Sequence, residues 1–160
     1  VVPVMRAQGH GRIVVINSVL GMVPMRWRGA YVASKYALEG LTHTLRLEMR
    51  GTGIHVVTIA PGPITSNIRR NSIPHFEHWV NWRASARADQ YERSLLKRLY
   101  EDRGPDPFEL APSAVTRRIA QAIEAPRPRA RYHVTTPTHM MAIARRILPV
   151  TALDWLLARG

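Results

Sequence analysis

The chain has 160 residues, of which 46% are hydrophobic, and this predicts one globular domain with a sizeable core rather than a disordered chain. It contains no cysteine, which excludes a disulfide framework and a thiolate metal site. The formal net charge of +12 would suit an anionic partner, but the arginines are spread along the sequence and no nucleic-acid-binding motif accompanies them. We therefore expect no nucleic-acid partner.

Neither a signal peptide nor a membrane-spanning segment is predicted. Residues 1–6 lack a charged leader followed by a long apolar core. No stretch approaches the ~18 uninterrupted apolar residues that a transmembrane helix needs. We expect a cytoplasmic protein, with peripheral contact at a membrane surface left open.

Two short apolar runs enclose one long amphipathic segment in the first part of the chain. Residues 1–8 are predicted to end a helix that leads into a turn at 9–11. Residues 12–17 and 54–60 are apolar on both faces, which is typical of strands buried in a parallel sheet. Between them, apolar residues recur every three or four positions, which predicts a long helix. They are Ala33, Ala37, Leu38, Leu41, Leu45 and Met49.

Tyr31 and Lys35 lie at the start of this predicted helix. Residues four apart share one helix face, with Cβ atoms about 5–6 Å apart. A phenol is a weak acid with a reference pKa of about 10, and a neighbouring ammonium favours its phenolate form. Tyr31 would then exchange a proton with an alcohol or carbonyl oxygen. The alternative is a half-buried tyrosine beside a solvated lysine, because this pair alone is a common pattern.

Ser18 follows the first predicted strand, and Pro61 and Gly62 follow the second. In a parallel sheet these positions and the start of the connecting helix meet at the carboxyl edge, where open α/β sheets bind ligands. Glycine allows a close backbone approach, and proline fixes φ in the loop. The sequence therefore predicts a ligand site at this edge, although a serine in such a position is also a common turn former.

The three regions contain the motifs G-R-I-V-V-I-N-S at 11–18, Y-V-A-S-K at 31–35 and P-G-P-I-T at 61–65. In order and spacing these motifs resemble the short-chain dehydrogenase/reductase family. The resemblance is specific over residues 1–65 and weaker beyond them. It implies an α/β fold of the Rossmann type with a doubly wound parallel sheet. Residues 1–136 would form the C-terminal part of that NAD(P)-binding domain, followed by a helical tail at 137–160.

The resemblance implies a role for each catalytic candidate. Ser18 would hydrogen-bond the substrate oxygen, and Tyr31 would be the general acid/base. Lys35 would stabilise the phenolate and hydrogen-bond the nicotinamide ribose, so that Tyr31 and Lys35 also contact the cofactor. The reaction would be hydride transfer between NAD(P)(H) and a small-molecule alcohol or carbonyl substrate.

The resemblance assigns the loop after the second strand to the cofactor. Pro61, Gly62 and Ile64 would hold the nicotinamide ring through backbone contacts, and Thr65 would lie near its carboxamide or phosphate. The cofactor would be NADP or NAD, with NADP favoured.

The family's glycine-rich phosphate loop is missing from this sequence. Neither G-x-G-x-x-G nor G-x-x-x-G-x-G opens a predicted helix, and Gly9 and Gly11 precede a strand. We expect the C-terminal part of a longer enzyme that lacks roughly a hundred residues by usual domain size, inactive alone and with an exposed sheet edge at 12–17. The alternative is a truncated or degenerate non-catalytic paralogue that acts as a binding or membrane-associated module.

Residues 66–110 resemble the family's variable substrate lid. A polar loop is predicted at 66–72, followed by helices near 76–80 and 95–100. The aromatic side chains between residues 74 and 100 are Phe76, Trp79, Trp82, Tyr91 and Tyr100. An aromatic lid suggests an apolar substrate, although ordinary helix packing explains these residues equally well. His75 and His78 form a conceivable metal pair, but no third ligand accompanies them, so no metal is expected.

The C-terminal part is predicted to contain a helix that starts at Pro112, a short strand at 131–135 and two helices at 137–148 and 151–159. The motif R-Y-H-V and the A-R-R-I-L-P tail resemble bacterial family members that look like retinol dehydrogenases and NADP-dependent aldehyde reductases. The apolar tail would pack within the enzyme, cover the substrate pocket or lie on an anionic membrane. Packing within the enzyme is favoured, and association with further copies of the chain stays open.

Overall fold

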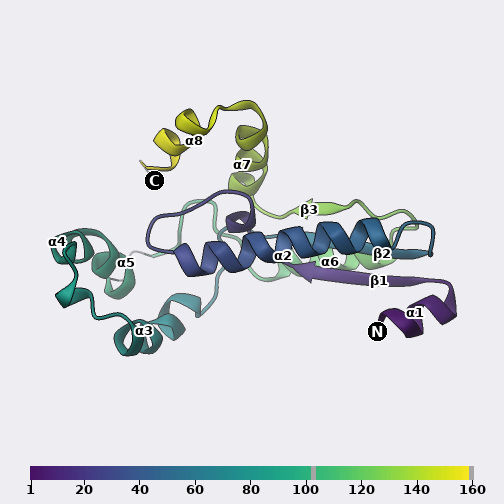
Figure 1. The fold of residues 1–160 in the computed structure, drawn as a ribbon, viewed down its shortest axis with the longest axis horizontal. Coiled ribbons are helices and arrows are strands. Elements are labelled where there is room, and N and C mark those ends of the chain that lie inside the picture. The colour runs from purple at the N-terminus through teal and green to yellow at the C-terminus, as the bar shows by residue number, and fades with distance from the viewer. Residues whose placement is uncertain (102–103, 159–160) are drawn as a thin grey trace.

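The computed structural model describes residues 1–101 and 104–158, and its centre is a three-stranded parallel β-sheet (Figure 1). The strands are β1 (Gly11–Ile16), β2 (Ile54–Ala60) and β3 (Arg131–His133), in the spatial order β1-β2-β3. β1 pairs with β2 along its whole length, from Gly11↔Ile54 to Ile16↔Ile59. The predicted α/β class and both long predicted strands are confirmed.

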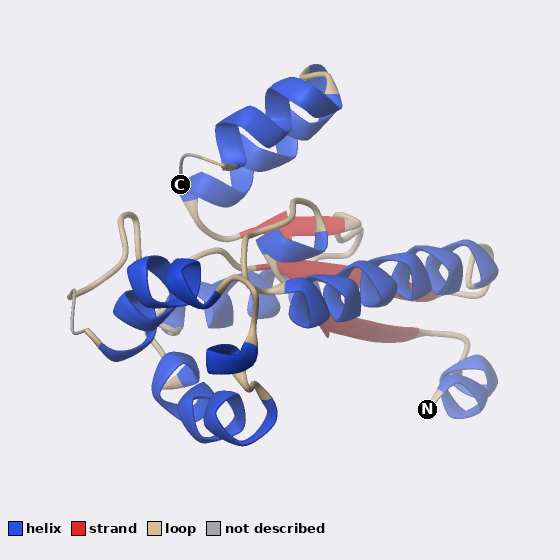
Figure 2. Cartoon of the chain, turned by 60° about the vertical axis from the view of Figure 1, so that its left-hand side comes forward, coloured by secondary structure: helices blue, strands red, loops and turns tan. Residues whose placement is uncertain are grey.

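Helices surround the sheet and also form a separate group at one end of the molecule. Near the sheet lie α1 (Val2–Gln8), η1 (Val19–Gly21), α2 (Gly29–Glu48) and α6 (Ser113–Glu124), whereas α7 (Thr136–Ile147) and α8 (Val150–Leu157) project away from it on the side of η1 (Figure 1). The separate group consists of α3 (Ile68–Trp79), η2 (Trp82–Ala84), α4 (Ala88–Gln90), η3 (Tyr91–Leu96) and α5 (Lys97–Tyr100). This group lies beyond the amino end of α2 (Figures 1 and 2) and corresponds to the predicted lid.

The sheet is covered on both faces, by α2 on one side and α6 on the other (Figure 1). Val57 and Ile59 of β2 pack in one apolar cluster with Ala122 of α6. Val56, which directly precedes Val57, packs in a second cluster with Met49 at the end of α2. Because side chains alternate along a strand, β2 is buried on both faces, as its continuous apolar sequence predicts.

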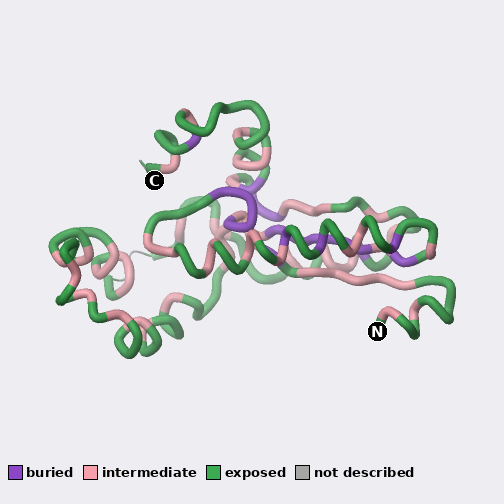
Figure 3. Tube along the Cα trace, in the orientation of Figure 1, coloured by how far each residue is buried: buried purple, intermediate pink, exposed green. Residues whose placement is uncertain are grey.

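β1 forms one edge of the described sheet (Figure 3). Its side chains are half-buried and Ile16 is 43% exposed, whereas Thr58 and Ile59 of β2 are fully buried. The apolar sequence of β1 suits a strand with neighbours on both sides. The predicted exposed edge is therefore confirmed for the residues that the structure describes.

The predicted polar loop at 66–72 is wrong, because α3 begins at Ile68 and continues through Pro74. Ile73 and Phe76 are half-buried and lie at helical spacing, so one face of α3 is sheltered throughout. Pro74 lies inside this helix, where its missing N–H removes one backbone hydrogen bond, rather than opening a new segment.

The C-terminal prediction is largely confirmed. α6 follows Pro112 and ends before Pro126, and the two tail helices are separated at Pro149. β3 is shorter than the predicted 131–135, because Thr135 is already the N-cap of α7. The predicted end of the last helix at residue 159 lies outside the described residues.

The tail packs on its own domain, as expected. Leu153 of α8 is 9% exposed and shares an apolar cluster with Leu20 and Val23, which follow β1. Met141 of α7 and Tyr31 of α2 pack against the same cluster. None of the described helices is both long enough and apolar enough to span a bilayer.

His133 at the end of β3 makes the stability of the fold depend on pH. Its Nε2 is buried without a hydrogen-bond partner among the described residues, and its ring lies edge-on to that of His139. Burial, with smaller effects of His139, Arg131 and Arg146, lowers the pKa of His133 to about 4. The unfolded chain, with a histidine pKa of about 6.5, then binds more protons than the folded chain between these two values. Stability therefore falls as the pH drops from about 6.5 to about 4.

We predict that His133→Gln removes most of this pH-dependent loss, because glutamine does not titrate. The urea midpoint, measured between about pH 7 and pH 4, should fall less in the variant than in the wild type. His75→Gln, a change at an exposed histidine, is the control and should follow the wild type. Parallel curves for all three proteins would contradict the assignment to His133.

Candidate active site

Ser18 lies directly beyond the carboxyl end of β1, where backbone hydrogen bonds continue the pairing with the β2 segment. Asn17 N donates to Ile59 O at 2.9 Å, and Val19 N donates to Pro61 O at 2.7 Å. Ser18 is the N-cap of η1, and its Oγ accepts the N–H of Leu20 at 3.1 Å. Its hydroxyl proton has no acceptor among the described residues, so this group is free to donate to a ligand oxygen.

Tyr31 and Lys35 lie on the first two turns of α2, as the sequence predicts. Lys35 Nζ lies 5.6 Å from the centre of the Tyr31 ring. Tyr31 also packs against the apolar cluster that contains Val19 and Leu20, the residues that follow Ser18. The structure therefore brings the Ser18 turn and the Tyr31–Lys35 pair to the same edge of the sheet, and no carboxylate in the described part of the chain pairs with Lys35.

A further cation lies near Tyr31. Arg28 is half-buried, and burial followed by repulsion from Arg98 lowers its pKa, whereas Tyr31 and Asp106 act in the opposite direction. Arg28 and Lys35 therefore place two cationic side chains near the phenol ring of Tyr31.

The loop after β2 is held in place by the segment that precedes α6. Leu110 N donates to Pro63 O at 3.2 Å and Thr65 N donates to Leu110 O at 3.0 Å, which forms a short parallel bridge around Ile64. Thr65 Oγ1 donates to Glu109 Oε1 at 2.7 Å, and this bond lowers the pKa of Glu109. The Thr65 hydroxyl can still accept a hydrogen bond, but its proton is already used.

Gly62 is packed more closely than sequence reasoning indicates. A Cβ at Gly62 would lie 2.1 Å from Thr135 Oγ1 and 2.7 Å from Thr138 Oγ1. Both threonines are fully buried, and their hydroxyls lie 2.9 Å apart in a hydrogen bond. The start of α7 therefore already requires glycine at this position, independently of any cofactor ring. Ile64 packs its side chain against the cluster of β2 and α6.

The lid contacts the segment between Ser18 and Tyr31. Trp27 adopts a left-handed backbone conformation with φ 64°, which is unusual for a large side chain. Its ring lies 4.8 Å from that of Tyr91, which in turn lies 6.4 Å from that of Phe76. A cavity of about 520 Å³ beside Trp27 is lined mainly by polar residues of this segment and of the lid. They include Arg26, Arg87, Asp89 and Arg93.

His75 and His78, the pair at which no metal is expected, lie on α3. Within residues 1–101 and 104–158, no group of three or more potential metal ligands occurs.

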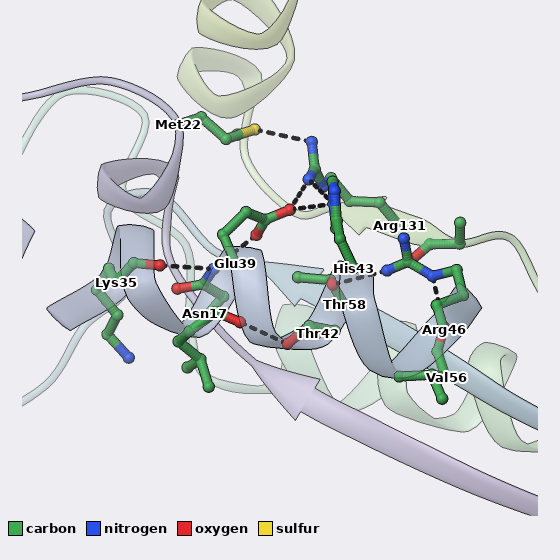
Figure 4. A network of polar contacts seen from close by, with 12 residues as sticks. Asn17, Met22, Lys35, Glu39, Thr42, His43, Arg46, Val56, Thr58 and Arg131 are labelled. Atoms are coloured by element: carbon green, nitrogen blue, oxygen red, sulfur yellow. Dashed lines mark hydrogen bonds and ion pairs between the residues drawn. The ribbon is translucent and has the colours of Figure 1, made fainter. Parts of the chain in front are cut away.

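Sequence reasoning missed a polar network around Glu39, one helical turn after Lys35 (Figure 4). Glu39 is 8% exposed and contacts Asn17, His43 and Arg131. The sequence feature that could have indicated Glu39 is its position four residues after Lys35, on the same face of the helix.

The parallel sheet covered by helices on both faces, with candidate reactive groups at its carboxyl edge, defines a Rossmann-type α/β protein. Comparison with known proteins agrees. Residues 1–76 match the family model described as "short chain dehydrogenase". Over these residues, which are just under half of its length, the chain is similar to the short-chain dehydrogenases.

Individual relatives extend this similarity beyond residue 76. The "Uncharacterized oxidoreductase YbbO" of Escherichia coli strain K12 is 35% identical over 155 residues, which cover 97% of this chain and 51% of that protein. The 17-beta-hydroxysteroid dehydrogenase type 1 of Homo sapiens is 28% identical over 135 residues, or 83% of this chain and 40% of that protein. The chain spans about half the length of the curated relatives it matches, or less.

Solved structures show the same fold. A short chain dehydrogenase from Burkholderia cenocepacia J2315, crystallised in complex with NADP, matches with a TM-score of 0.68 at 18% identity. The match covers 98% of this chain and 52% of that chain.

The contact around Gly62 gives a stability prediction. Gly62→Ala should destabilise the fold by about 1–3 kcal/mol, because its methyl group would overlap the buried Thr135 hydroxyl. In a Thr135→Ala background the same change should cost less, since the overlapping oxygen is gone. Urea unfolding of the four proteins measures the coupling, and an equal cost in both backgrounds would show that this overlap is not the cause.

Proposed function

We propose that the protein acts as an NAD(P)-dependent oxidoreductase that transfers hydride between nicotinamide and an alcohol or carbonyl substrate. The supporting observation is the placement of Lys35 beside the Tyr31 ring, next to the turn that carries Ser18. The match of residues 1–76 to the short-chain dehydrogenase family model and the similarity to an oxidoreductase agree with this activity.

The chemistry of the chain's own residues follows from this placement. In the reducing direction Tyr31 donates its hydroxyl proton to the carbonyl oxygen, and in the oxidising direction the phenolate takes the proton from the alcohol. Lys35 stabilises the phenolate, and Ser18 donates its free hydroxyl proton to the same substrate oxygen. A bound nicotinamide supplies or accepts the hydride.

Several residues would hold that cofactor. Tyr31 and Lys35 would contact its ribose, which suits the absence of a carboxylate partner for Lys35 among the described residues. The backbone of Pro61, Gly62 and Ile64 would hold the ring, and Thr65 would accept a hydrogen bond from the carboxamide. We favour NADP over NAD, because the Burkholderia structure contains NADP.

The phosphates of the cofactor need a further part of the fold. This sequence contains no glycine-rich loop that opens a helix. We therefore propose that the chain as given is inactive alone and acts together with the segment that carries this loop in the family.

The substrate we propose is a largely apolar alcohol or carbonyl compound, as in the group that resembles retinol dehydrogenases and NADP-dependent aldehyde reductases. Support comes from the aromatic contacts of Trp27, Tyr91 and Phe76 between the lid and the segment before Tyr31. The arginines that line the neighbouring cavity would meet a polar end of such a substrate.

The competing proposal is a non-catalytic paralogue that serves as a binding or membrane-associated module. Both proposals fit the fold, but only the enzyme needs the hydroxyl of Tyr31. Substitution of this single oxygen therefore discriminates between them.

In the complete protein, Tyr31→Phe should lower kcat by about 10²–10⁴-fold, because the ring stays and only the proton donor is lost. Binding of NADP, followed by fluorescence titration, should change little. Lys35→Ala should weaken both turnover and cofactor binding. Tyr36→Phe is the matched control, since Tyr36 donates its hydroxyl proton to Met22 O and lies outside the proposed site.

Retention of more than about a hundredth of the wild-type rate in Tyr31→Phe would contradict the acid/base role. Absence of turnover in the wild type with a broad panel of alcohols, aldehydes and ketones would favour the non-catalytic module.

A second proposal concerns the outer face of the tail, and it adds peripheral membrane contact to an otherwise cytoplasmic protein. Ile143, Ile147 and Val150 are 60%, 72% and 74% exposed, and Arg145 and Arg146 lie between them. Apolar side chains flanked by arginines suit the interface of an anionic bilayer.

The complete protein should therefore sediment with vesicles that contain phosphatidylserine at low salt, and the double variant Ile143→Ser/Ile147→Ser should not. Ile123→Ser changes an isoleucine of α6 that is 54% exposed, and it should still bind. If the wild type does not bind such vesicles at low salt, the tail has only a structural role.

A further inference from the structure

We propose that the ion pair between the buried Glu39 and the partly exposed Arg131 is a positioning device for the active site. Through Asn17 it holds the turn that carries Ser18 against the turn of α2 that carries Lys35. This role rests on the proposed function, because it concerns the geometry of the same site.

The side chain of Asn17 joins the two turns (Figure 4). Its Nδ2 donates to Glu39 Oε2 at 2.6 Å and to the backbone carbonyl oxygen of Lys35 at 3.3 Å. Asn17 is 4% exposed, so water does not replace these acceptors. Because Asn17 directly precedes Ser18, a shift of its side chain displaces the Ser18 turn relative to α2.

Gly21 of η1 also lies close to this amide. A Cβ at Gly21 would lie 2.7 Å from Asn17 Nδ2 and 3.0 Å from the backbone oxygen of Lys35. Glycine therefore lets the Ser18 turn approach α2 closely, and the Asn17 amide lies between this turn and the carboxylate of Glu39.

The carboxylate is fixed in turn by the last strand. Its second oxygen, Oε1, pairs with the guanidinium of Arg131 and with His43 Nε2 at 2.7 Å. Arg131 is the first residue of β3, and its Nη1 also donates to Met22 Sδ at 3.3 Å. Movement of Glu39 away from Arg131 would leave its buried carboxylate without this cation, which is strongly unfavourable.

The consequence for the reaction is geometric. Tyr31, Lys35 and Glu39 follow one another at intervals of four and therefore occupy neighbouring positions on one helix face. A displacement of about 1 Å at a reacting group lowers the rate by ~10²-fold, even when its cause lies far from the chemistry. Neither Glu39 nor Arg131 would touch substrate or cofactor, so both are positioning residues.

Two sets of variants separate positioning from stability. The double variant Glu39→Met/Arg131→Met removes both charges of the pair, which commonly preserves stability, but leaves Asn17 without its carboxylate acceptor. The control is Arg46→Gln. Arg46 anchors the same helix to the sheet, donating to Val56 O at 2.9 Å and to Ala130 O at 3.2 Å, and it does not contact Asn17.

In the complete protein we expect the double methionine variant to keep a urea midpoint near that of the wild type while kcat falls by ~10²-fold. The KM for the cofactor should stay within about threefold, because no binding group is removed. Arg46→Gln should show the opposite pattern, with a lower urea midpoint and an unchanged kcat.

Wild-type kcat in the double variant would overturn the proposal, as would a loss of kcat in Arg46→Gln of the same size. If the double variant does not fold, Asn17→Ala takes its place. It keeps the ion pair and must show the same loss of kcat.

Hydrogen exchange tests the positioning without turnover. Amides of residues 17–22 should exchange faster in the double variant than in Arg46→Gln, and equal exchange would overturn the proposal. If the wild type proves to have no hydride-transfer activity, the proposed function fails, while this comparison still decides whether the ion pair holds the Ser18 turn.

Discussion

The candidate site depends on the parallel pairing of β1 with the β2 segment, which continues past the end of the regular strand. Asn17 N bonds to Ile59 O and Val19 N bonds to Pro61 O. Since both segments run in the same direction, Ser18 and the loop that begins at Pro61 must leave the sheet at the same edge. α2 begins at that edge and carries Tyr31 in its first turn. Backbone hydrogen bonds and chain direction thus bring the candidate groups of these three elements to one edge of the sheet.

A second requirement is a partner for the buried carboxylate of Glu39. The cation comes from Arg131 at the start of β3, so the last strand of the sheet completes the environment of the helix that carries Tyr31 and Lys35. The threonines at the start of α7, immediately after that strand, likewise leave room only for glycine in the loop after β2. The C-terminal part of the domain therefore shapes the site although it contributes no proposed catalytic group.

Local patterns were enough to predict β1, β2, α2 and α6. Each of them shows a hydrophobic periodicity, or a helix-breaking residue at its boundary, within a short stretch of sequence. The motif spacing likewise predicted that Ser18 and Tyr31 lie at one edge. Prediction failed where a local signal was overridden: Pro74 usually breaks a helix, but the sheltered face of α3 continues through it. It also failed where the partner lies far along the chain, as for Glu39 and Arg131, since no short-range pattern specifies such a pair.

The most direct measurement is a crystal structure of the complete protein with NADP and a bound carbonyl ligand. The Ser18 Oγ and the Tyr31 hydroxyl should both lie within about 2.6–3.2 Å of one ligand oxygen, because both would hydrogen-bond it during proton transfer. A separation of the two hydroxyls beyond ~8 Å in that complex would place them out of joint reach of a single oxygen and would contradict the proposed active site.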